Sequence, residues 1–110
     1  MAVLVNSESY SAAEFFAAAL EEYGWAVTAG DPTCGKGYFQ NTYQLLDGSA
    51  VGLSIGKYFT PKGVSLADEG GLVPTLLVEV DADTAAQIYA QVLEPEEDPQ
   101  LQAAVAEPTK

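Results

Sequence analysis

An amphipathic helical repeat between two short apolar segments constrains the fold of this chain more than any other feature. Apolar side chains recur at spacings of three and four, the period of a helix with one buried face, at Ala12, Phe15, Phe16, Ala19, Leu20 and Tyr23. The run AVLV precedes the repeat, and residues 25–29 follow it after Gly24, a residue type that commonly ends helices. This order predicts a buried strand, a helix over residues 11–23 and a second strand.

The rest of the sequence predicts a hairpin followed by short elements. Residues 38–46 and 50–60 are rich in β-forming residues, and Asp47 and Gly48 between them mark a turn. We expect a loop at 67–71, a strand at 76–80, a helix at 81–93, a linker at 94–99 and a short helix at 100–107. The predicted fold class is therefore α/β, with a mixed sheet and flanking helices.

Length and charge limit the functions open to this chain. Its 110 residues suffice for one small domain, and its formal net charge is −12, with four basic residues, all lysines, and no histidine. Proteins that grip nucleic acid neutralise phosphates with Lys and Arg, so this charge argues against DNA, RNA and anionic membrane surfaces as partners. No run approaches the roughly 20 apolar residues of a membrane span, and the start of the chain lacks the basic residues of a signal peptide.

The lack of histidine also narrows the chemistry. A Ser-His-Asp triad and a Cys-His pair both need histidine, and the usual zinc sites need histidine or several cysteines, whereas Cys34 is the only cysteine. We interpret Cys34 as a small half-buried hydrophobic residue. A serine activated within this chain would therefore need a lysine or a carboxylate as its base.

Ser11 stands at the predicted start of the first helix and allows two interpretations. The run SAAE matches a capping box, with Ser11 as the N-cap and Glu14 three residues later. The same place suits a nucleophile, because a strand fixes the residue and the helix N-terminus offers N–H groups to a developing oxyanion. The motif by itself favours the cap, which is the commoner role.

The run GDPTCGKG, residues 30–37, is a second candidate site. It fits the phosphate-binding pattern as far as Lys36, but Gly37 replaces the required Ser or Thr, and a strand-like segment follows in place of a helix. Nucleotide binding is therefore disfavoured. Lys36 is a base if burial favours its neutral form, and otherwise it is an ordinary surface lysine on a turn.

An acidic cluster near the C-terminus is a weaker candidate. Its carboxylates are close enough in sequence to hold a metal ion loosely, but a solvated linker is the better interpretation of Glu94, Glu96, Glu97 and Asp98. We expect neither a metal nor a cofactor in this chain.

Ser11, Lys36 and Gln40 occur in a pattern that resembles the C-terminal processing (tail-specific) peptidase family. In that family a strand ending in Val-Asn leads to a Ser-Ala-x-Glu helix start, and a Gly-Lys-Gly-x-x-Gln element follows the helix. Here the serine and the lysine are 25 residues apart (36 − 11), and the glutamine lies four beyond the lysine (40 − 36). The runs LLDGS, YFTPKG and GGLVP are similar to later elements of the family, so the resemblance covers about residues 3–105.

The resemblance implies a serine peptidase with a lysine base on a crotonase or Clp protease type of core. Ser11 would attack the scissile carbonyl, and Lys36 would take its proton. Gln40 would orient the Lys36 amine, and the backbone N–H of Ala12 would donate to the oxyanion. The implied substrate is a polypeptide cleaved near its C-terminus, with no metal and no small-molecule cofactor.

The chain departs from the family by what it lacks, namely a PDZ domain and the upstream part of the catalytic core with its second oxyanion donor. We therefore expect residues 1–110 to be the C-terminal portion of a catalytic domain. We also expect little or no activity from it alone, because one missing donor costs on the order of a hundredfold in rate. The alternative is a non-catalytic peptide-binding or assembly module on the same scaffold.

Two further expectations concern assembly and location. An incomplete sheet exposes an unpaired edge and apolar surface, which predicts a homodimer, with exchanged elements as one form of it. The resemblance implies that the parent enzyme works outside the cytoplasm, in the periplasm or at the surface of a bacterial cell.

Overall fold

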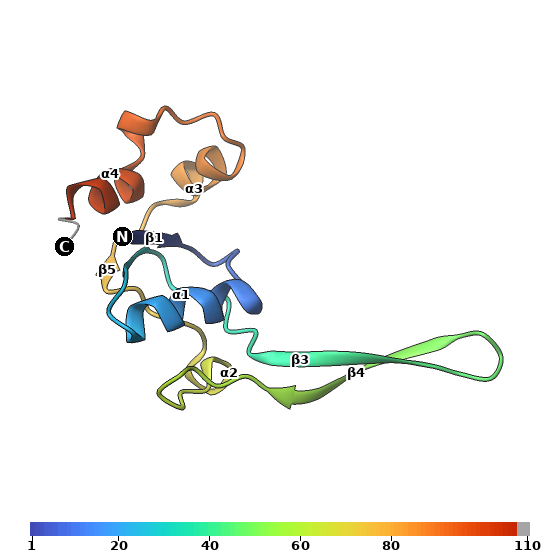
Figure 1. The fold of residues 1–110 in the computed structure, drawn as a ribbon. Helices are drawn as coiled ribbons and strands as arrows, with labels where there is room; N and C mark the ends of the chain where they lie inside the picture. The colour runs from blue at the N-terminus through green and yellow to red at the C-terminus, as the bar shows by residue number, and fades with distance from the viewer. Residues whose placement is uncertain (108–110) are drawn as a thin grey trace.

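The computed structural model describes residues 1–107 and shows short strands interleaved with helices (Figure 1). Along the chain the elements are β1 (Ala2–Val5), α1 (Ala12–Glu22), β2 (Val27–Gly30), β3 (Tyr38–Gln44), β4 (Ala50–Lys57), α2 (Leu66–Glu69), β5 (Leu76–Leu77), α3 (Ala82–Tyr89), the 3₁₀ turn η1 (Pro95–Glu97) and α4 (Pro99–Ala106). The α/β class is confirmed. Its parallel and antiparallel strands lie in two separate sheets.

The parallel sheet contains the predicted β-α-β unit. β1 pairs with β2, with Val3 opposite Thr28 and Val5 opposite Gly30, and β5 pairs with the other side of β2. The strand order is therefore β1-β2-β5. Gly30 has φ 129°, and a Cβ at this position would overlap the carbonyl oxygen of Val5, so the two strands approach closely because residue 30 is glycine.

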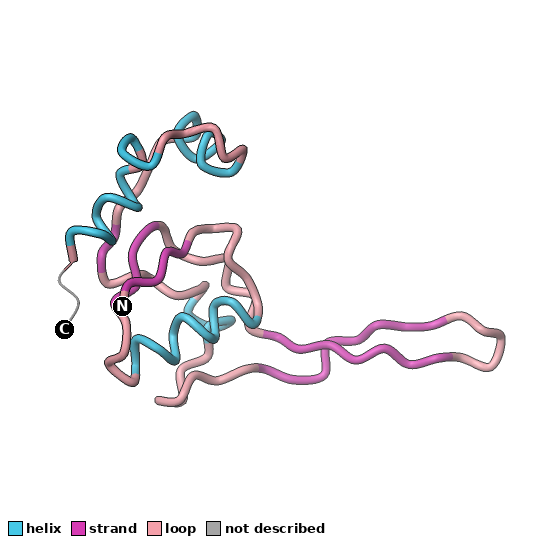
Figure 2. Tube along the Cα trace, turned by 45° about the horizontal axis from the view of Figure 1, so that its top comes forward, coloured by secondary structure: helices cyan, strands magenta, loops and turns pink. Residues whose placement is uncertain are grey.

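Helices α1 and α4 pack against β1 and β2. They lie on either side of β1 in both views (Figure 1 and Figure 2). On the α1 side, the hydroxyl of Thr28 donates to the carboxylate of Glu21 at 2.7 Å and accepts from the N–H of Thr75 at 3.1 Å. Thr28 is fully buried. This threonine therefore ties α1, β2 and the segment leading into β5 together.

The buried face of α1 is not the face that the apolar spacing predicted. Ala17 and Ala18 are 1% and 2% exposed, and Glu14 beside them is fully buried, whereas Phe16 and Tyr23 of the predicted face are 66% and 62% exposed. Alanine side chains allow the helix backbone to approach the sheet closely. Phe16 and Tyr23 are consequently left on the surface, whereas Phe15 is half-buried.

The hairpin β3–β4 projects away from the parallel sheet (Figure 1). In the antiparallel register Tyr43 lies opposite Val51, so both side chains share one face, and Thr42 lies opposite Gly52 on the other. Every residue of the two strands except Gly56 is exposed. The hairpin therefore has one apolar and one polar face, with neither covered.

Size measurements agree with this uncovered arrangement. The accessible surface is 7205 Å², whereas a compact monomer of this mass exposes about 5,800 Å². The Cα radius of gyration is 16.7 Å, compared with about 13 Å for a compact chain of this length. The exposed strands of the hairpin contribute to both differences.

Aromatic contacts and one ion pair fix the base of the hairpin. The ring of Tyr58 lies 5.0 Å from that of Phe15 on α1 and 5.2 Å from that of Phe39 on β3, measured between centroids. Lys57 Nζ lies 2.7 Å from a carboxylate oxygen of Asp68 on α2. These contacts place the start of β3 next to α1.

Two strand predictions need correction. The second strand begins at Val27, because the N–H groups of Trp25 and Ala26 donate to the carbonyl of Leu20 and close the end of α1. The strand expected at 76–80 is only two residues long, because β2 ends at Gly30 and offers no partner beyond it.

The helical predictions differ in three places. The helix expected to reach residue 93 ends at Tyr89, because Gln91 has φ 57° and the chain reverses there. The loop expected at 67–71 contains most of α2, whose N-cap Ser65 accepts a hydrogen bond from the N–H of Asp68 at 3.3 Å. The expected linker at 94–99 contains η1 and the first residue of α4.

β1 is also less buried than predicted. Leu4 is 46% exposed and Val5 only 5%. β1 stands at the edge of the parallel sheet, so part of it has no neighbouring strand within the described residues.

Candidate active site

Ser11 lies at the turn between the loop after β1 and the first turn of α1. Its backbone has φ 57° and ψ −124°, and within residues 1–107 Gln91 is the only other non-glycine residue with a positive φ. Side chains rarely adopt positive φ, because the Cβ then crowds the backbone. The surrounding structure must therefore hold Ser11 in this conformation.

The first N–H groups of α1 lie next to this serine. The N–H of Ala12 donates no backbone hydrogen bond within residues 1–107, as is usual for the first residues of a helix. Unpaired N–H groups at a helix N-terminus carry partial positive charge and attract anions. A negative oxygen that develops beside Ser11 could therefore be stabilised here.

Glu14 joins the serine end of α1 to the loop that carries Lys36. Its Oε2 accepts a hydrogen bond from the N–H of Ser11 at 2.9 Å, and Ser11 and Glu14 form the predicted capping box. Its Oε1 accepts from the hydroxyl of Thr33 and from the N–H of Gly35, both at 2.6 Å. One fully buried carboxylate thus holds both the serine backbone and the lysine loop.

The glycines on either side of Lys36 make contacts that only glycine permits. A Cβ at Gly35, which has φ 84°, would lie 2.7 Å from the carbonyl carbon of Gly70. A Cβ at Gly37 would lie 2.6 Å from the backbone nitrogen of Ala67. The loop around Lys36 is therefore packed against α2 and against Gly70, which caps its C-terminal end. This packing restricts where the lysine can lie.

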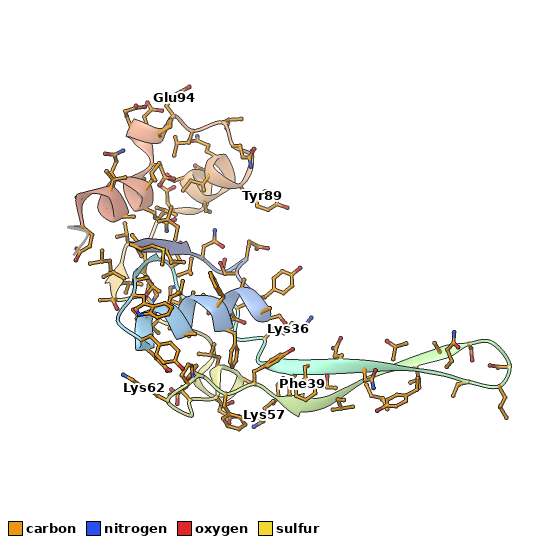
Figure 3. The ribbon with its side chains drawn as sticks, in the orientation of Figure 1. Lys36, Phe39, Lys57, Lys62, Tyr89 and Glu94 are labelled. Carbon is orange, nitrogen blue, oxygen red and sulfur yellow. The ribbon has the colours of Figure 1, made fainter. Side chains whose placement is uncertain are left out.

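The side chain of Lys36 is exposed and lies over an aromatic ring. Its Nζ is 5.6 Å from the ring centroid of Tyr10, the residue before Ser11. Figure 3 shows Lys36 beside the first turn of α1. The structure therefore brings Ser11, Ala12 and Lys36 to the same end of one helix.

Gln40 lies on β3, four residues after the lysine. It lies on the polar face of β3 and is exposed, and within residues 1–107 its side chain makes no hydrogen bond to Lys36. The orienting bond implied by the resemblance is therefore not among the hydrogen bonds of residues 1–107, and the role of Gln40 stays a prediction.

Sequence reasoning missed most of the role of Glu14 and all of that of Thr33. The SAAE motif identified Glu14 as a capping partner, but no local pattern indicated that its second oxygen meets a loop about twenty residues later. Thr33, which is 5% exposed, also accepts a hydrogen bond from the N–H of Leu72 at 2.7 Å. These long-range contacts exist only once α1 and the loop are packed together.

The other candidates from the sequence are Cys34, the loop before β3 and the possible metal ligands. Cys34 is exposed, so the prediction of a half-buried residue is wrong: its N–H donates to the carbonyl of Ser9 while its side chain faces outward from the loop. The loop at residues 31–37 leads into the strand β3, as the sequence predicted, and not into the helix that follows a phosphate-binding loop. In the described part of the chain no cluster of three or more histidine, cysteine or acidic residues is placed to hold a metal ion. None of the helices in residues 1–107 is long and apolar enough to cross a membrane.

Several known proteins are similar to this chain in sequence and in fold. The chloroplastic carboxyl-terminal-processing peptidase 1 of Arabidopsis thaliana is 44% identical over 72 residues, which are 66% of this chain and 14% of that protein. A carboxyl-terminal-processing protease of Synechocystis is 33% identical over 105 residues, covering 96% of this chain and 23% of its own. The solved photosystem II D1 C-terminal processing protease superposes with a TM-score of 0.68 at 31% identity, over 91% of this chain and 26% of that one.

The mature CPAF structure, at 22% identity and a TM-score of 0.65, shares the fold. The chain spans about a quarter or less of the relatives it matches. The sequence model of peptidase family S41 matches residues 1–78. The chain therefore belongs to peptidase family S41.

Proposed function

We propose that this chain is the C-terminal portion of a C-terminal processing peptidase domain and carries its nucleophile, Ser11, and its general base, Lys36. The observation that carries the proposal is the positive φ of Ser11 at the start of α1. Such a conformation persists at a non-glycine residue when the surroundings hold it, and it is frequent at active sites. The buried Glu14 carboxylate supports the assignment, because it holds Ser11 and the Lys36 loop together.

The proposed reaction is hydrolysis of a peptide bond. The Ser11 oxygen bonds to the scissile carbonyl carbon while its proton passes to the neutral Lys36 amine, and the N–H of Ala12 donates to the oxyanion. The carbon–nitrogen bond then breaks, and the leaving amine takes the proton from Lys36. Water attacks the resulting ester, with Lys36 accepting a proton from the water and returning one to Ser11.

The isolated chain holds these groups in an incomplete site. A lysine accepts a proton only in its neutral form, which burial favours, and Lys36 is exposed here. Gln40 makes no hydrogen bond to it within residues 1–107, and Ala12 supplies one oxyanion donor. We therefore propose that residues outside this chain cover Lys36 and supply a second donor, and that the chain alone has little or no peptidase activity.

Labelling with a fluorophosphonate probe tests the assignment. In the complete parent domain, Ser11 is expected to be labelled, and Ser11→Ala is expected to abolish both labelling and cleavage of an unstructured peptide. Ser49→Ala, at the tip of the hairpin, is the matched control and should leave both unchanged. Labelling that survives Ser11→Ala would place the nucleophile elsewhere.

The non-catalytic peptide-binding module is the second candidate, favoured by the exposed position of Lys36 and the uncovered apolar face of the hairpin. It predicts that the wild-type parent domain binds peptides but neither reacts with the probe nor cleaves. Cleavage by the parent domain that depends on Lys36 would exclude it.

Assembly and location remain predictions. We propose that the apolar face of the hairpin, with Tyr43 and Val51, pairs with a second copy when the chain is isolated, since an uncovered two-stranded ribbon is marginally stable. Light scattering that shows only monomer at high concentration would contradict this. The proposal that the parent works outside the cytoplasm rests on the resemblance. Of the relatives named above, the Arabidopsis thaliana peptidase is chloroplastic by name, and the Synechocystis protease comes from a bacterium.

A further inference from the structure

A cleft of about 440 Å³ lies between the carboxyl end of the parallel sheet and helix α3. Its floor is formed by the loop after β1, which includes Glu8, by Asp31 directly after β2 and by Gln100 of α4. Grooves at the carboxyl ends of parallel strands are common binding sites in α/β proteins. Neither proposed catalytic residue lines this cleft.

Within residues 1–107, two carboxylates of the cleft pair with no lysine. Gln100, which is 5% exposed, donates through Nε2 to Asp31 Oδ2 and to the carbonyl of Val78, both at 2.8 Å. These two bonds use both donor hydrogens of the amide, and within residues 1–107 Asp31 Oδ1 has no side-chain partner. Glu8 is exposed and pairs with no lysine in the described part of the chain. The floor therefore offers two negative charges, of which that of Asp31 is held in position by the buried amide of Gln100.

The opposite wall is apolar. Ala85, Ile88 and Tyr89 of α3 line it, and Tyr89 is 79% exposed. In Figure 3 Tyr89 extends from α3 toward the same side of the view as Lys36. An apolar wall with an aromatic ring, facing two carboxylates, complements a side chain that has an aliphatic stem and a cationic tip.

The cleft is also near the proposed nucleophile along the chain. Glu8 precedes Ser11 by three residues, so their Cα atoms are at most about 10 Å apart. A substrate in extended conformation advances about 3.3 Å per residue. A side chain about two or three residues from the scissile bond would therefore reach the cleft.

We propose that this cleft is a substrate subsite that takes a lysine or arginine side chain of the polypeptide, a few residues from the bond at Ser11. The assignment rests on the proposed function, since it places the peptide at Ser11. Asp31 and Glu8 bind the cationic tip, and Ile88 and Tyr89 pack against the stem. The net charge of −12 adds a long-range attraction for basic segments.

Calorimetric titration of the 110-residue chain with short unstructured peptides tests the subsite. The peptides differ at one position, which carries lysine, the uncharged norleucine or glutamate. Two partly exposed charge pairs are expected to make the lysine peptide bind about tenfold more tightly than the norleucine peptide. Glu8→Gln and Asp31→Asn should each reduce that ratio several-fold, and backbone NMR shifts caused by the lysine peptide should centre on Ile88 and Tyr89.

Two controls make each outcome decisive. Glu69→Gln removes an equal charge from α2, outside the cleft, and should leave the ratio unchanged; an equal loss there would show that only overall charge attracts the peptide. Equal binding of the lysine and norleucine peptides, or no binding of either, would overturn the subsite. Ser11→Ala should retain the preference for the lysine peptide, because Ser11 does not line the cleft. If the fluorophosphonate probe fails to label Ser11 but the lysine preference is intact, the proposed chemistry is rejected and the cleft stays a site for basic peptides.

Discussion

Two regions of the molecule differ in how far their side chains are buried. One is the parallel sheet packed against α1, and the other is the β3–β4 hairpin. In the parallel sheet small residues bring backbones close together, and the polar groups that become buried, Glu14 and Thr28, are fully hydrogen-bonded. In the hairpin large residues such as Tyr43 and Leu53 alternate correctly on one face but meet only solvent.

The difference in burial also separates the candidate site residues into two groups. Ser11, Ala12 and the Lys36 loop are attached to the parallel sheet and α1, and their geometry is supported by buried contacts. Gln40 belongs to the hairpin and has no such support. The comparison predicts that disturbances of the first region are costly and disturbances of the second are slight.

The largest expected effect is that of Glu14→Ala. The change removes the acceptor of three hydrogen bonds and leaves the buried hydroxyl of Thr33 and the half-buried N–H groups of Ser11 and Gly35 unpaired, so the free energy of unfolding should fall by about 3 kcal/mol or more. Urea denaturation measures it. Glu97→Ala, at an exposed position of η1, is the control and should change stability by less than about 0.5 kcal/mol. A small loss for Glu14→Ala would mean that the carboxylate does not join α1 to the loop.

The second largest effect is expected in amide hydrogen exchange, which should be slower in the parallel sheet than in the hairpin. Backbone amides of β2 are buried between β1 and β5, whereas those of β3 and β4 lie on an exposed ribbon, so protection should be about a hundredfold greater in β2. The measurement is exchange followed by NMR at two protein concentrations. Hairpin protection that rises with concentration would support pairing with a second copy, and equal protection at low concentration would break the comparison.

Two glycine substitutions sharpen the same contrast. Gly30→Ala forces a Cβ against the Val5 carbonyl at φ 129° and should lower the free energy of unfolding by about 2 kcal/mol. Gly52→Ala places a Cβ in open space on β4 and should change it by no more than about 0.5 kcal/mol. Thermal or urea unfolding of both variants under one set of conditions checks the pair. Similar losses would mean that the hairpin is packed as tightly as the sheet.

The smallest effect is expected at the ion pair that joins the hairpin to α2. The hydrogen bond from Lys57 lowers the pKa of Asp68, with a further contribution from Ser65, and the same bond raises the pKa of Lys57. The Asp68 contribution is therefore present above the unfolded pKa and is lost as pH falls through the folded value. The Lys57 contribution is present below its unfolded pKa and is lost as pH rises through the raised value.

The pair therefore acts between acidic pH, near 4, and alkaline pH, near 10. Lys57→Met should raise hydrogen exchange at the base of the hairpin by about twofold at neutral pH, because exposed pairs contribute little. Lys62→Met is the control, since Lys62 forms no ion pair within residues 1–107. A variant that loosened β2 as well would show that the two regions are not separate.

Elements that depend on neighbouring residues could be predicted from the sequence. The α1 repeat, the turn at Asp47 and Gly48 and the capping box of Ser11 and Glu14 all follow from local periodicity and backbone preference. The candidate site residues came from the spacing of Ser11, Lys36 and Gln40 within a resemblance, and spacing does not report which of them meet. The structure places Ser11 and Lys36 at one end of α1 and Gln40 on the exposed hairpin.

Predictions that depended on partners in space failed. The apolar spacing of α1 predicted an aromatic buried face, but the face that is buried carries Ala17 and Ala18. Similarly, the last predicted strand stops at Leu77 because β2 ends. Exposure of Cys34 follows from how its loop is anchored, which no local pattern reports.

The sequence by itself determined the first strand–helix–strand unit, the hairpin after it, the capped start of α1 and the acidic character of the chain, because each depends on local backbone preference or on composition. Only the tertiary structure decided that Glu14 is shared between Ser11 and the Lys36 loop, and that Asp31 and Glu8 face α3 across a cleft. Those contacts join residues far apart in the chain, and they form only when packing brings the segments together.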